Sequence, residues 1–184
     1  MPVTGDAASH RRNTFMDDWG IRPEVTADQP LIRDVHVRAF GRDNEADLVD
    51  KLRAGGGFAN DLSLVATASG AIAGHILFTP IRVGTHAALA LAPMAVLPQF
   101  QNRGIGSALV IEGLARCARR GHGVIIVVGH EHYYPRFGFV PARPRGIESP
   151  FRVPDDAWMV FEACAGALTG VTGLVEYPSA FMEA

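Results

Sequence analysis

The stretch Gln101-Asn102-Arg103-Gly104-Ile105-Gly106 decides the fold, because it lies between a strand-like segment and a helix-like segment. Residues 87–96, which precede it, are apolar at every position, and residues 104–120 carry apolar residues at helical spacing. A loop between a strand end and a helix N-terminus gathers unpaired backbone N–H groups and the positive end of the helix dipole. The stretch therefore predicts a binding site for an anion such as a diphosphate.

Both glycines of this stretch suit an anion site for the same steric reason. Because Gly104 and Gly106 lack a Cβ atom, the backbone N–H groups beside them can approach a diphosphate closely. Gln101 and Arg103 could close over the anion from the side, since an amide and a guanidinium both donate hydrogen bonds to phosphate. We therefore expect the backbone to bind the anion and the two side chains to cover it.

Two other glycine-rich phosphate loops do not fit the residues that follow. A dinucleotide-binding fingerprint needs a third glycine where Leu109 stands, and an acidic residue after the next strand, where Gly129 and His130 are found. The phosphate loop of nucleotide hydrolases needs a lysine after the glycines, but Gly106 is followed by Ser107. An oxidoreductase of the dinucleotide-binding class is therefore disfavoured.

Apolar periodicity outside the loop predicts a sheet. In chain order, strands are expected at residues 19–24, 62–66, 71–83, 87–96 and 124–128, then from residue 139, and at 158–163 and 170–177. The strands at 87–96 and 124–128 enclose a helix and should therefore lie parallel, as in a right-handed crossover. Pro93 cannot donate to a strand ladder, so it predicts a bulge or a separation of strands at that point.

Three helices are expected beside this sheet. The first should begin at a capping box of Thr26 and Gln29 and end at Gly41, and Asn44 should cap the second. The third should cover residues 104–120. The residues expected to face the core are Leu31, Ile32, Val35 and Ala39 in the first helix, and Ile105, Ala108, Leu109, Ile111, Ala115 and Ala118 in the third.

Two motifs together resemble a known family. Gln101-x-x-Gly104-x-Gly106 is similar to the Q/R-x-x-G-x-G/A signature of the GNAT superfamily of N-acetyltransferases, and residues 134–139 are similar to its Tyr-x-x-x-Gly-Phe segment. Residues 74–78, 91–98 and 133–139 also resemble the YhbS-type branch of predicted bacterial acetyltransferases. The resemblance extends over residues 20–177. It implies an α/β fold whose mixed, mostly antiparallel central sheet is splayed between two parallel central strands and flanked by helices.

The resemblance also implies acetyl-CoA as the acyl donor. The backbone N–H groups of residues 103–107 would bind the CoA diphosphate, and residues 94–96 would pair with the pantetheine arm like an added strand. A backbone N–H near Ala95 would polarise the thioester carbonyl, as in an oxyanion hole. The residues assigned to the cofactor are Met94, Ala95, Val96, Gln101, Asn102, Arg103, Gly104, Ile105, Gly106 and Ser107.

The catalytic residues are expected after residues 124–128. Tyr134 stands four residues before Gly138, where the general acid of the family stands, and Tyr133 is its rival. A phenol suits protonation of a thiolate leaving group, whose basicity lies below its own. No motif singles out a general base: His130 and Glu131 are candidates, and Glu45 is a third on the helix that should line the acceptor side.

Bulk composition limits the remaining possibilities. The 184 residues are 48% hydrophobic and 20% charged, with a formal net charge of −2, which is typical of a folded protein without a basic field for nucleic acid or membranes. Residues 1–18 are expected to form a flexible arm and residues 19–184 one acyltransferase domain. No apolar run reaches the ~20 residues of a membrane span and no signal peptide is evident, so a cytoplasmic protein is expected.

Neither a metal nor a reactive cysteine is expected. His130 and His132 have no third ligand in view, and Cys117 and Cys164 are far apart in the sequence, so transfer should be direct. The acceptor is expected to be an amine, on a small molecule or a peptide, and the chain could form a homodimer. The alternative function is an acetyl-CoA-binding sensor or scaffold without catalysis, although such a protein would have no need of Tyr134.

Overall fold

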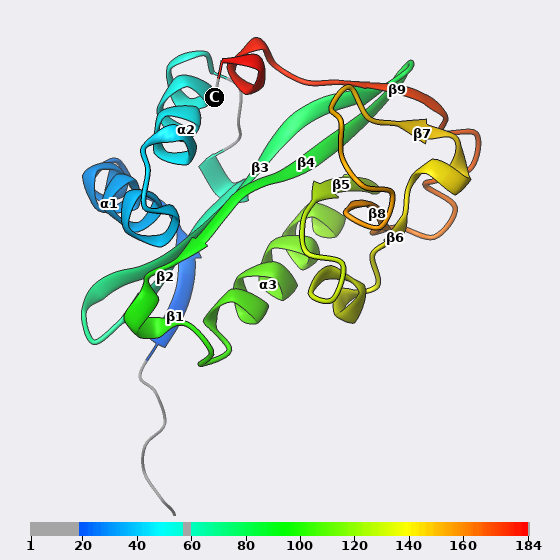
Figure 1. The fold of residues 1–184 in the computed structure, drawn as a ribbon. Helices are drawn as coiled ribbons and strands as arrows, with labels where there is room; N and C mark the ends of the chain where they lie inside the picture. Colours follow the sequence, from blue (N-terminus) through cyan, green and yellow to red (C-terminus); the bar gives the residue numbers. More distant parts are fainter. Residues whose placement is uncertain (1–18, 57–59, 184) are drawn as a thin grey trace, which may run out of the picture.

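The computed structural model describes residues 19–56 and 60–183, so the arm expected at residues 1–18 lies outside the described residues. Figure 1 shows an open, twisted sheet with helices on both of its faces. The strands are β1 (Trp19–Pro23), β2 (Ser63–Ala68), β3 (Ala71–Val83), β4 (His86–Val96), β5 (Val124–Val128), β6 (Val140–Pro141), β7 (Ile147–Glu148), β8 (Trp158–Glu162) and β9 (Gly173–Glu176). The helices are α1 (Gln29–Phe40), α2 (Asn44–Ala54) and α3 (Ile105–Arg119).

The strands form a mixed sheet in the order β1-β2-β3-β4-β5-β8-β6, and β9 pairs with both β3 and β7. Along that path every neighbouring pair is antiparallel except β4 and β5, which are parallel. The parallel pair is joined through α3, as the predicted crossover requires. The predicted fold class is therefore confirmed.

The parallel pair is also where the sheet separates. The ladder between β4 and β5 consists of Leu89 opposite Ile125 and Ala90 opposite Ile126, although both strands continue beyond it. On its other side β4 bulges: Phe78 pairs with Leu91 and Ile76 with Met94, so that two residues, 92 and 93, stand opposite one residue of β3. The bulge predicted from Pro93 is therefore confirmed, and it lies where β4 leaves β5.

The two faces of the sheet bury different helices. Helices α1 and α2 pack on one face through Ile32 and Leu52 against Leu77, whereas α3 packs on the other through Leu109 against Phe78. The predicted stripe of α1 needs one correction. Leu31 is 52% exposed, and His36 lies on the buried face. The start of α1 also differs, because Asp28 accepts a hydrogen bond from the backbone N–H of Val25 in place of the predicted pair of Thr26 and Gln29.

The predicted stripe of α3 is wrong at Ile111, which is 60% exposed. Phe78 explains the shift, because a Cβ atom at Gly113 would lie 2.3 Å from its ring. The helix therefore approaches the sheet most closely along the side that carries Gly113, and Ile111 is turned toward solvent. The buried residues of α3 are Ile105, Leu109, Val110, Gly113, Leu114 and Cys117.

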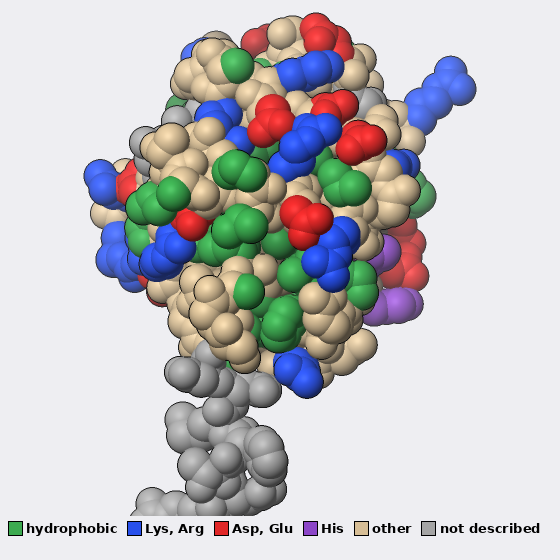
Figure 2. Space-filling model, turned by 90° about the vertical axis from the view of Figure 1, so that its left-hand side faces the viewer, with side chains coloured by type: hydrophobic (Ala, Val, Ile, Leu, Met, Phe, Trp, Pro, Cys, Tyr) green, Lys and Arg blue, Asp and Glu red, His purple; other side chains and the backbone are tan. Residues whose placement is uncertain are grey.

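Charged side chains on the α1 and α2 side are paired with their opposites. Arg33 lies 2.8 Å from both Asp47 and Asp50, and Arg38 lies 3.2 Å from Asp34. Figure 2, which shows the left-hand side of Figure 1, has basic and acidic side chains beside one another among hydrophobic ones. On this face the pairing leaves no continuous field of one sign that would attract a polyanion.

A buried polar chain connects α1 to the sheet. His36 Nε2 lies 2.8 Å from His75 Nδ1, and His75 Nε2 lies 2.8 Å from Ser63 Oγ. Ser63 donates to the carboxylate of Glu24, which also accepts hydrogen bonds from Arg53. Because Ser63 donates its hydroxyl proton to Glu24, the Ser63 oxygen accepts a hydrogen bond from His75 Nε2–H. His75 Nδ1 then accepts from His36 Nε2–H, and both rings are neutral.

The electrostatics of this chain agree with neutral rings beside one carboxylate. Burial lowers the pKa of His36 to about 3, and the neighbouring His75 and Arg53 act in the same direction. Burial would raise the pKa of Glu24, but hydrogen bonds from His75, Arg53 and Ser63 outweigh it and bring that pKa to about 2. Protonation of either group is therefore disfavoured in the folded protein.

We expect the free energy of unfolding to fall as the pH falls below about 6.5, the ordinary pKa of histidine. A group whose folded pKa is depressed stabilises the fold above its unfolded pKa, and that contribution is lost as the pH falls toward the folded value. For His36 the window runs from 6.5 to about 3, and for Glu24 from 4.5 to about 2. Each proton taken up on unfolding contributes about 1.4 kcal/mol per pH unit.

Urea unfolding at several pH values between 7 and 4 measures this slope. His36→Gln should reduce the slope below pH 6, because it removes a group whose folded pKa is depressed. A slope that is the same in His36→Gln and in the unsubstituted protein would show that His36 does not titrate on unfolding.

Candidate active site

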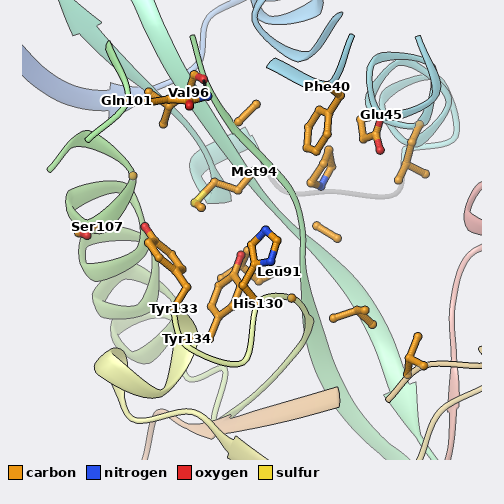
Figure 3. A pocket seen from close by; sticks show the side chains of 18 of the residues that line it. Phe40, Glu45, Leu91, Met94, Val96, Gln101, Ser107, His130, Tyr133 and Tyr134 are labelled. Carbon is orange, nitrogen blue, oxygen red and sulfur yellow. Dashed lines mark hydrogen bonds between the residues drawn. The ribbon is translucent and has the colours of Figure 1, made fainter. Parts of the chain in front are cut away.

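A cavity of about 1220 Å³ lies where β4 and β5 separate. One end is formed by the loop before α3, the middle by residues 91–96 of β4 and by residues 128–130 and 133–134, and the far end by the α1–α2 corner with residues 151, 153, 177 and 181. Figure 3 shows labelled side chains of β4, of residues 130–134 and of the α1–α2 corner around one space. The cavity therefore joins the predicted anion loop to the predicted acceptor side.

Most of the predicted site residues line this cavity. Those that do are Met94, Ala95, Val96, Gln101, Asn102, Gly104, Gly106, Ser107, His130 and Tyr134. The side chain of Ile105 is buried in the core instead, and the Arg103 guanidinium lies over Phe100, 5.8 Å from the ring centre. The structure thus brings together the loop, the strand edge and Tyr134, which are distant in the sequence.

The loop before α3 has the geometry of an anion site. Gly104 precedes the first residue of α3 with φ of +86°, a conformation that favours glycine. Gln101 does not extend over the loop as predicted. Its side-chain amide donates to the carbonyl of Val96 at 2.9 Å and so ties the loop to the end of β4. The free N–H groups of the first turn of α3 therefore open toward the cavity beside β4.

The register of β4 determines which backbone groups face the slot between β4 and β5. Leu97 donates its N–H to Ala73 of β3 at 2.8 Å, and Ala95 stands opposite His75. Hydrogen-bonded and non-hydrogen-bonded pairs alternate in an antiparallel ladder, so the N–H of Ala95 points toward β3. The N–H groups of Met94 and Val96 point toward the slot. The donor predicted near Ala95 is thus better assigned to one of its two neighbours.

Tyr134 lies at the floor of the cavity with its ring packed into the core. It is 7% exposed, and its ring contacts Phe139 edge to face at a centroid distance of 5.5 Å. Burial raises the pKa of its phenol, and Tyr133 adds to that shift, so the hydroxyl is protonated at neutral pH. Figure 3 shows this hydroxyl pointing up into the cavity beside the ring of His130. A proton donor is thus present at the slot.

The neighbouring Tyr133 points in a different direction. A Cβ atom at Gly106 would lie 2.9 Å from the Tyr133 hydroxyl oxygen, so this hydroxyl reaches the first turn of α3. Arg136 covers the Tyr133 ring at 4.5 Å and lines the cavity as well. From the sequence, Tyr133 was predicted only as a rival general acid, and Arg136 was not predicted at all. The position of Arg136, three residues after Tyr133 in a turn, was a usable signal.

Of the three candidate bases, Glu45 and His130 line the cavity, and His130 and Glu131 differ in position. His130 lines the cavity, whereas Glu131 does not: its carboxylate lies 3.1 Å from His132, whose side chain is exposed. Asp156, a second carboxylate beside it, raises the pKa of Glu131. Within residues 19–56 and 60–183, no group of three or more His, Cys, Asp or Glu side chains could bind a metal ion, and no helix is long and apolar enough to cross a membrane.

Sequence comparison gives several relatives of this chain. Residues 59–141 match the family described as an acetyltransferase (GNAT) domain. The chain is 36% identical over 151 residues to the uncharacterised N-acetyltransferase YjhQ of Escherichia coli strain K12, covering 78% of this chain and 83% of YjhQ. It is 35% identical over 164 residues to the uncharacterised N-acetyltransferase YhbS of the same strain, covering 88% of this chain and 97% of YhbS.

Solved structures agree with these relatives. The crystal structure of Escherichia coli YhbS in complex with CoA is similar with a TM-score of 0.85 and 34% identity, covering 89% of this chain and 92% of that one. A GNAT family acetyltransferase from Brucella melitensis in complex with acetyl-CoA is similar with a TM-score of 0.75 and 31% identity, covering 90% and 99%. The similarity therefore extends over almost the whole of both solved chains.

We expect Gly129→Ala to lower the free energy of unfolding by about 1–3 kcal/mol, the usual cost of overpacking. A Cβ atom at this position would lie 2.1 Å from the Tyr134 ring, so the ring must move. In a Tyr134→Ala background most of this loss in the free energy of unfolding should disappear. A double-mutant cycle of urea unfolding measures the difference. Gly20→Ala, where a Cβ atom has room, is the control. An undiminished cost in that background would contradict the packing of Tyr134 on Gly129.

Proposed function

Because the chain belongs to the GNAT family of N-acetyltransferases, we propose that it transfers an acetyl group directly from acetyl-CoA to a primary amine. One observation carries this proposal. The first turn of α3, the edge of β4 and the hydroxyl of Tyr134 line a single cavity that continues to the α1–α2 corner. A donor site, a leaving-group acid and space for an acceptor are therefore contiguous.

In this proposal the first turn of α3 binds the CoA diphosphate. The backbone N–H groups of residues 103–107 supply hydrogen bonds, and the helix dipole supplies a favourable potential. The Tyr133 hydroxyl reaches the first turn of α3 and Arg136 covers the Tyr133 ring, and both side chains can donate hydrogen bonds to phosphate oxygens. The residues on this chain thus fit a charged diphosphate without a metal ion.

The pantetheine arm would lie along the edge of β4 that β5 leaves unpaired. Beyond Ala90, where the ladder to β5 ends, the backbone groups of Met94 and Val96 can pair with the amides of the arm as a neighbouring strand would. This pairing would place the thioester in the slot. The N–H of Met94 or Val96 would then stabilise the oxyanion that forms on the thioester carbonyl.

In the transfer itself the acceptor nitrogen loses two protons and the departing sulfur gains one. The acceptor ammonium gives a proton to His130, either directly or through a water molecule. Its nitrogen then attacks the acetyl carbon. The C–N bond forms, the tetrahedral intermediate loses its second N–H proton to water, and the C–S bond breaks. His130 returns the first proton to solvent. Tyr134 gives its proton to the departing thiolate and regains one from solvent. The products are the acetamide, CoA thiol and one proton released to water.

We expect Tyr134→Phe to reduce kcat by about 10²-fold or more, the scale of general acid catalysis, while acetyl-CoA affinity stays nearly unchanged. Only the hydroxyl is lost, and the ring keeps its contact with Phe139. Tyr133→Phe is the matched control, and it should weaken CoA binding more than it lowers kcat, because its hydroxyl reaches Gly106. The measurements are steady-state thiol release and calorimetry with CoA.

Loss of kcat in Tyr133→Phe with full activity in Tyr134→Phe would show that Tyr133 is the general acid. If neither hydroxyl affects turnover, protonation of the thiolate comes from solvent, and the role proposed for Tyr134 is wrong.

Gly106→Val should weaken CoA binding by at least 100-fold without unfolding the protein. The added side chain would collide with the Tyr133 hydroxyl and fill the space in front of the first turn of α3. Gly20→Val, at an exposed edge strand, is the matched control. Calorimetry with CoA, together with thermal unfolding of each variant, separates the two effects. Micromolar CoA affinity in folded Gly106→Val would show that the diphosphate binds elsewhere.

A further inference from the structure

The far end of the cavity differs in character from the end at α3. Its lining residues are Phe40, Arg42, Glu45, Leu48, Phe151, Val153, Tyr177 and Phe181. Six of these eight side chains are aromatic or aliphatic, and the only charged ones are a single arginine and a single glutamate. In the proposed reaction, no part of acetyl-CoA occupies this end, so its chemistry reports on the acceptor.

The acidic side chain among these residues is less exposed than its basic partner, although both line the cavity. The carboxylate of Glu45, in the first turn of α2, is 16% exposed, whereas the side chain of Arg42 is 62% exposed. Arg42 donates to both carboxylate oxygens, and this pairing lowers the pKa of Glu45, which therefore stays anionic. Figure 3 shows the Glu45 carboxylate beside Phe40 on the side of the cavity away from Tyr133. Both side chains line the cavity, so a molecule at this end lies beside a carboxylate that stays charged.

Aromatic rings from two further segments also line this end. Phe151 contacts Tyr177 at a ring distance of 5.1 Å, and Tyr177 contacts Phe181 at 4.7 Å. They come from the loop before β8 and from the C-terminal segment, whose Glu183 lies 3.1 Å from Lys51 on α2. The C-terminal segment is thus joined to the helix that carries Glu45, and the far end is bounded by three separate parts of the chain.

On the basis of the acetyl transfer proposed above, we propose that this end binds the acceptor as a small primary alkylammonium ion carrying an aromatic or branched hydrocarbon group. The carboxylate of Glu45 attracts the ammonium group, and the rings of Phe151, Tyr177 and Phe181 bury the hydrocarbon. An ammonium ion is also attracted by aromatic faces, so the two kinds of side chain act together. An anionic acceptor would instead be repelled by Glu45. A strongly polar acceptor would lose its hydration against the rings without gaining hydrogen bonds in return.

Glu45 has a binding role in this proposal, and the proton leaves by the route described above. Because Arg42 occupies both of its oxygens, Glu45 is a weak base but a permanent negative charge. The ammonium group therefore joins an existing ion pair as a second cation. Removal of the Glu45 charge should then raise KM for the amine and leave the affinity for acetyl-CoA unchanged.

The first experiment is a panel of amines assayed by thiol release from acetyl-CoA. The probes are 2-phenylethylamine and isopentylamine against ethanolamine, spermidine, and peptides with a free N-terminus or a lysine. We expect kcat/KM to be at least tenfold higher for the first two, because a pocket that buries a hydrocarbon discriminates by that order. Preference for spermidine, ethanolamine or either peptide would overturn the inference.

The second experiment uses matched variants. Glu45→Gln should raise KM for 2-phenylethylamine by at least tenfold, whereas Glu112→Gln, which removes an equivalent Arg–Glu pair on α3, should not. Phe151→Ala should reduce the preference for 2-phenylethylamine over ethanolamine. An unchanged KM in Glu45→Gln would remove Glu45 from the acceptor site.

A third measurement separates this inference from the proposed function. Calorimetry measures the binding of 2-phenylethylamine to the CoA-saturated protein and does not depend on turnover. Weaker binding in Glu45→Gln would support the inference even if the enzyme turns over slowly. If acetyl-CoA stabilises the protein but the amine does not bind the CoA complex, the inference fails and the proposed function stands. If acetyl-CoA does not bind at all, the proposed function fails first.

Discussion

The separation of β4 from β5 is the constraint on which the rest of the site depends. Two strands that lie parallel and adjacent would normally continue their ladder, but here it ends after Ala90, and the bulge at residues 92 and 93 turns β4 away. The consequence is an unpaired strand edge inside a folded sheet, where backbone groups are normally satisfied. A ligand with its own amides can pair with that edge, and the proposed donor has two such amides in its arm. The fold thus exposes backbone groups of β4 with which such a ligand can pair.

In the proposed reaction, the donor and the acceptor lie toward different faces of the sheet. On the α3 face the helix N-terminus, Tyr133 and Arg136 surround the anion end, while on the other face the α1–α2 corner brings Glu45 toward the cavity. The buried chain from Glu24 to His36 connects α1 to β2 and β3, and His36 stacks on Phe40, which lines the far end of the cavity. A stable connection of α1 to the sheet therefore also fixes one side of the proposed acceptor site.

The sequence was sufficient to predict those features that depend on residues close together in the chain. The loop before α3, the parallel pair around it and the disruption at Pro93 all follow from a few consecutive residues, and the structure contains each of them. The side of α3 that is buried could not be predicted, because it depends on Phe78 reaching Gly113 from another element. The orientation of the β4 N–H groups needs the register with β3. The far end of the cavity draws on residues 40–48, 151–153 and 177–181, whose proximity no sequence pattern records.

Above all, the thioester carbonyl should lie at the unpaired edge of β4, with the sulfur near Tyr134. A crystal structure with an acetyl-CoA analogue that has a non-cleavable thioether and a carbonyl tests this directly. We expect the carbonyl oxygen about 2.7–3.1 Å from the N–H nitrogen of Met94 or Val96, and the sulfur within hydrogen-bonding reach of the Tyr134 hydroxyl. A pantetheine arm that avoids the slot, or a carbonyl oxygen that contacts neither N–H group, would contradict the account.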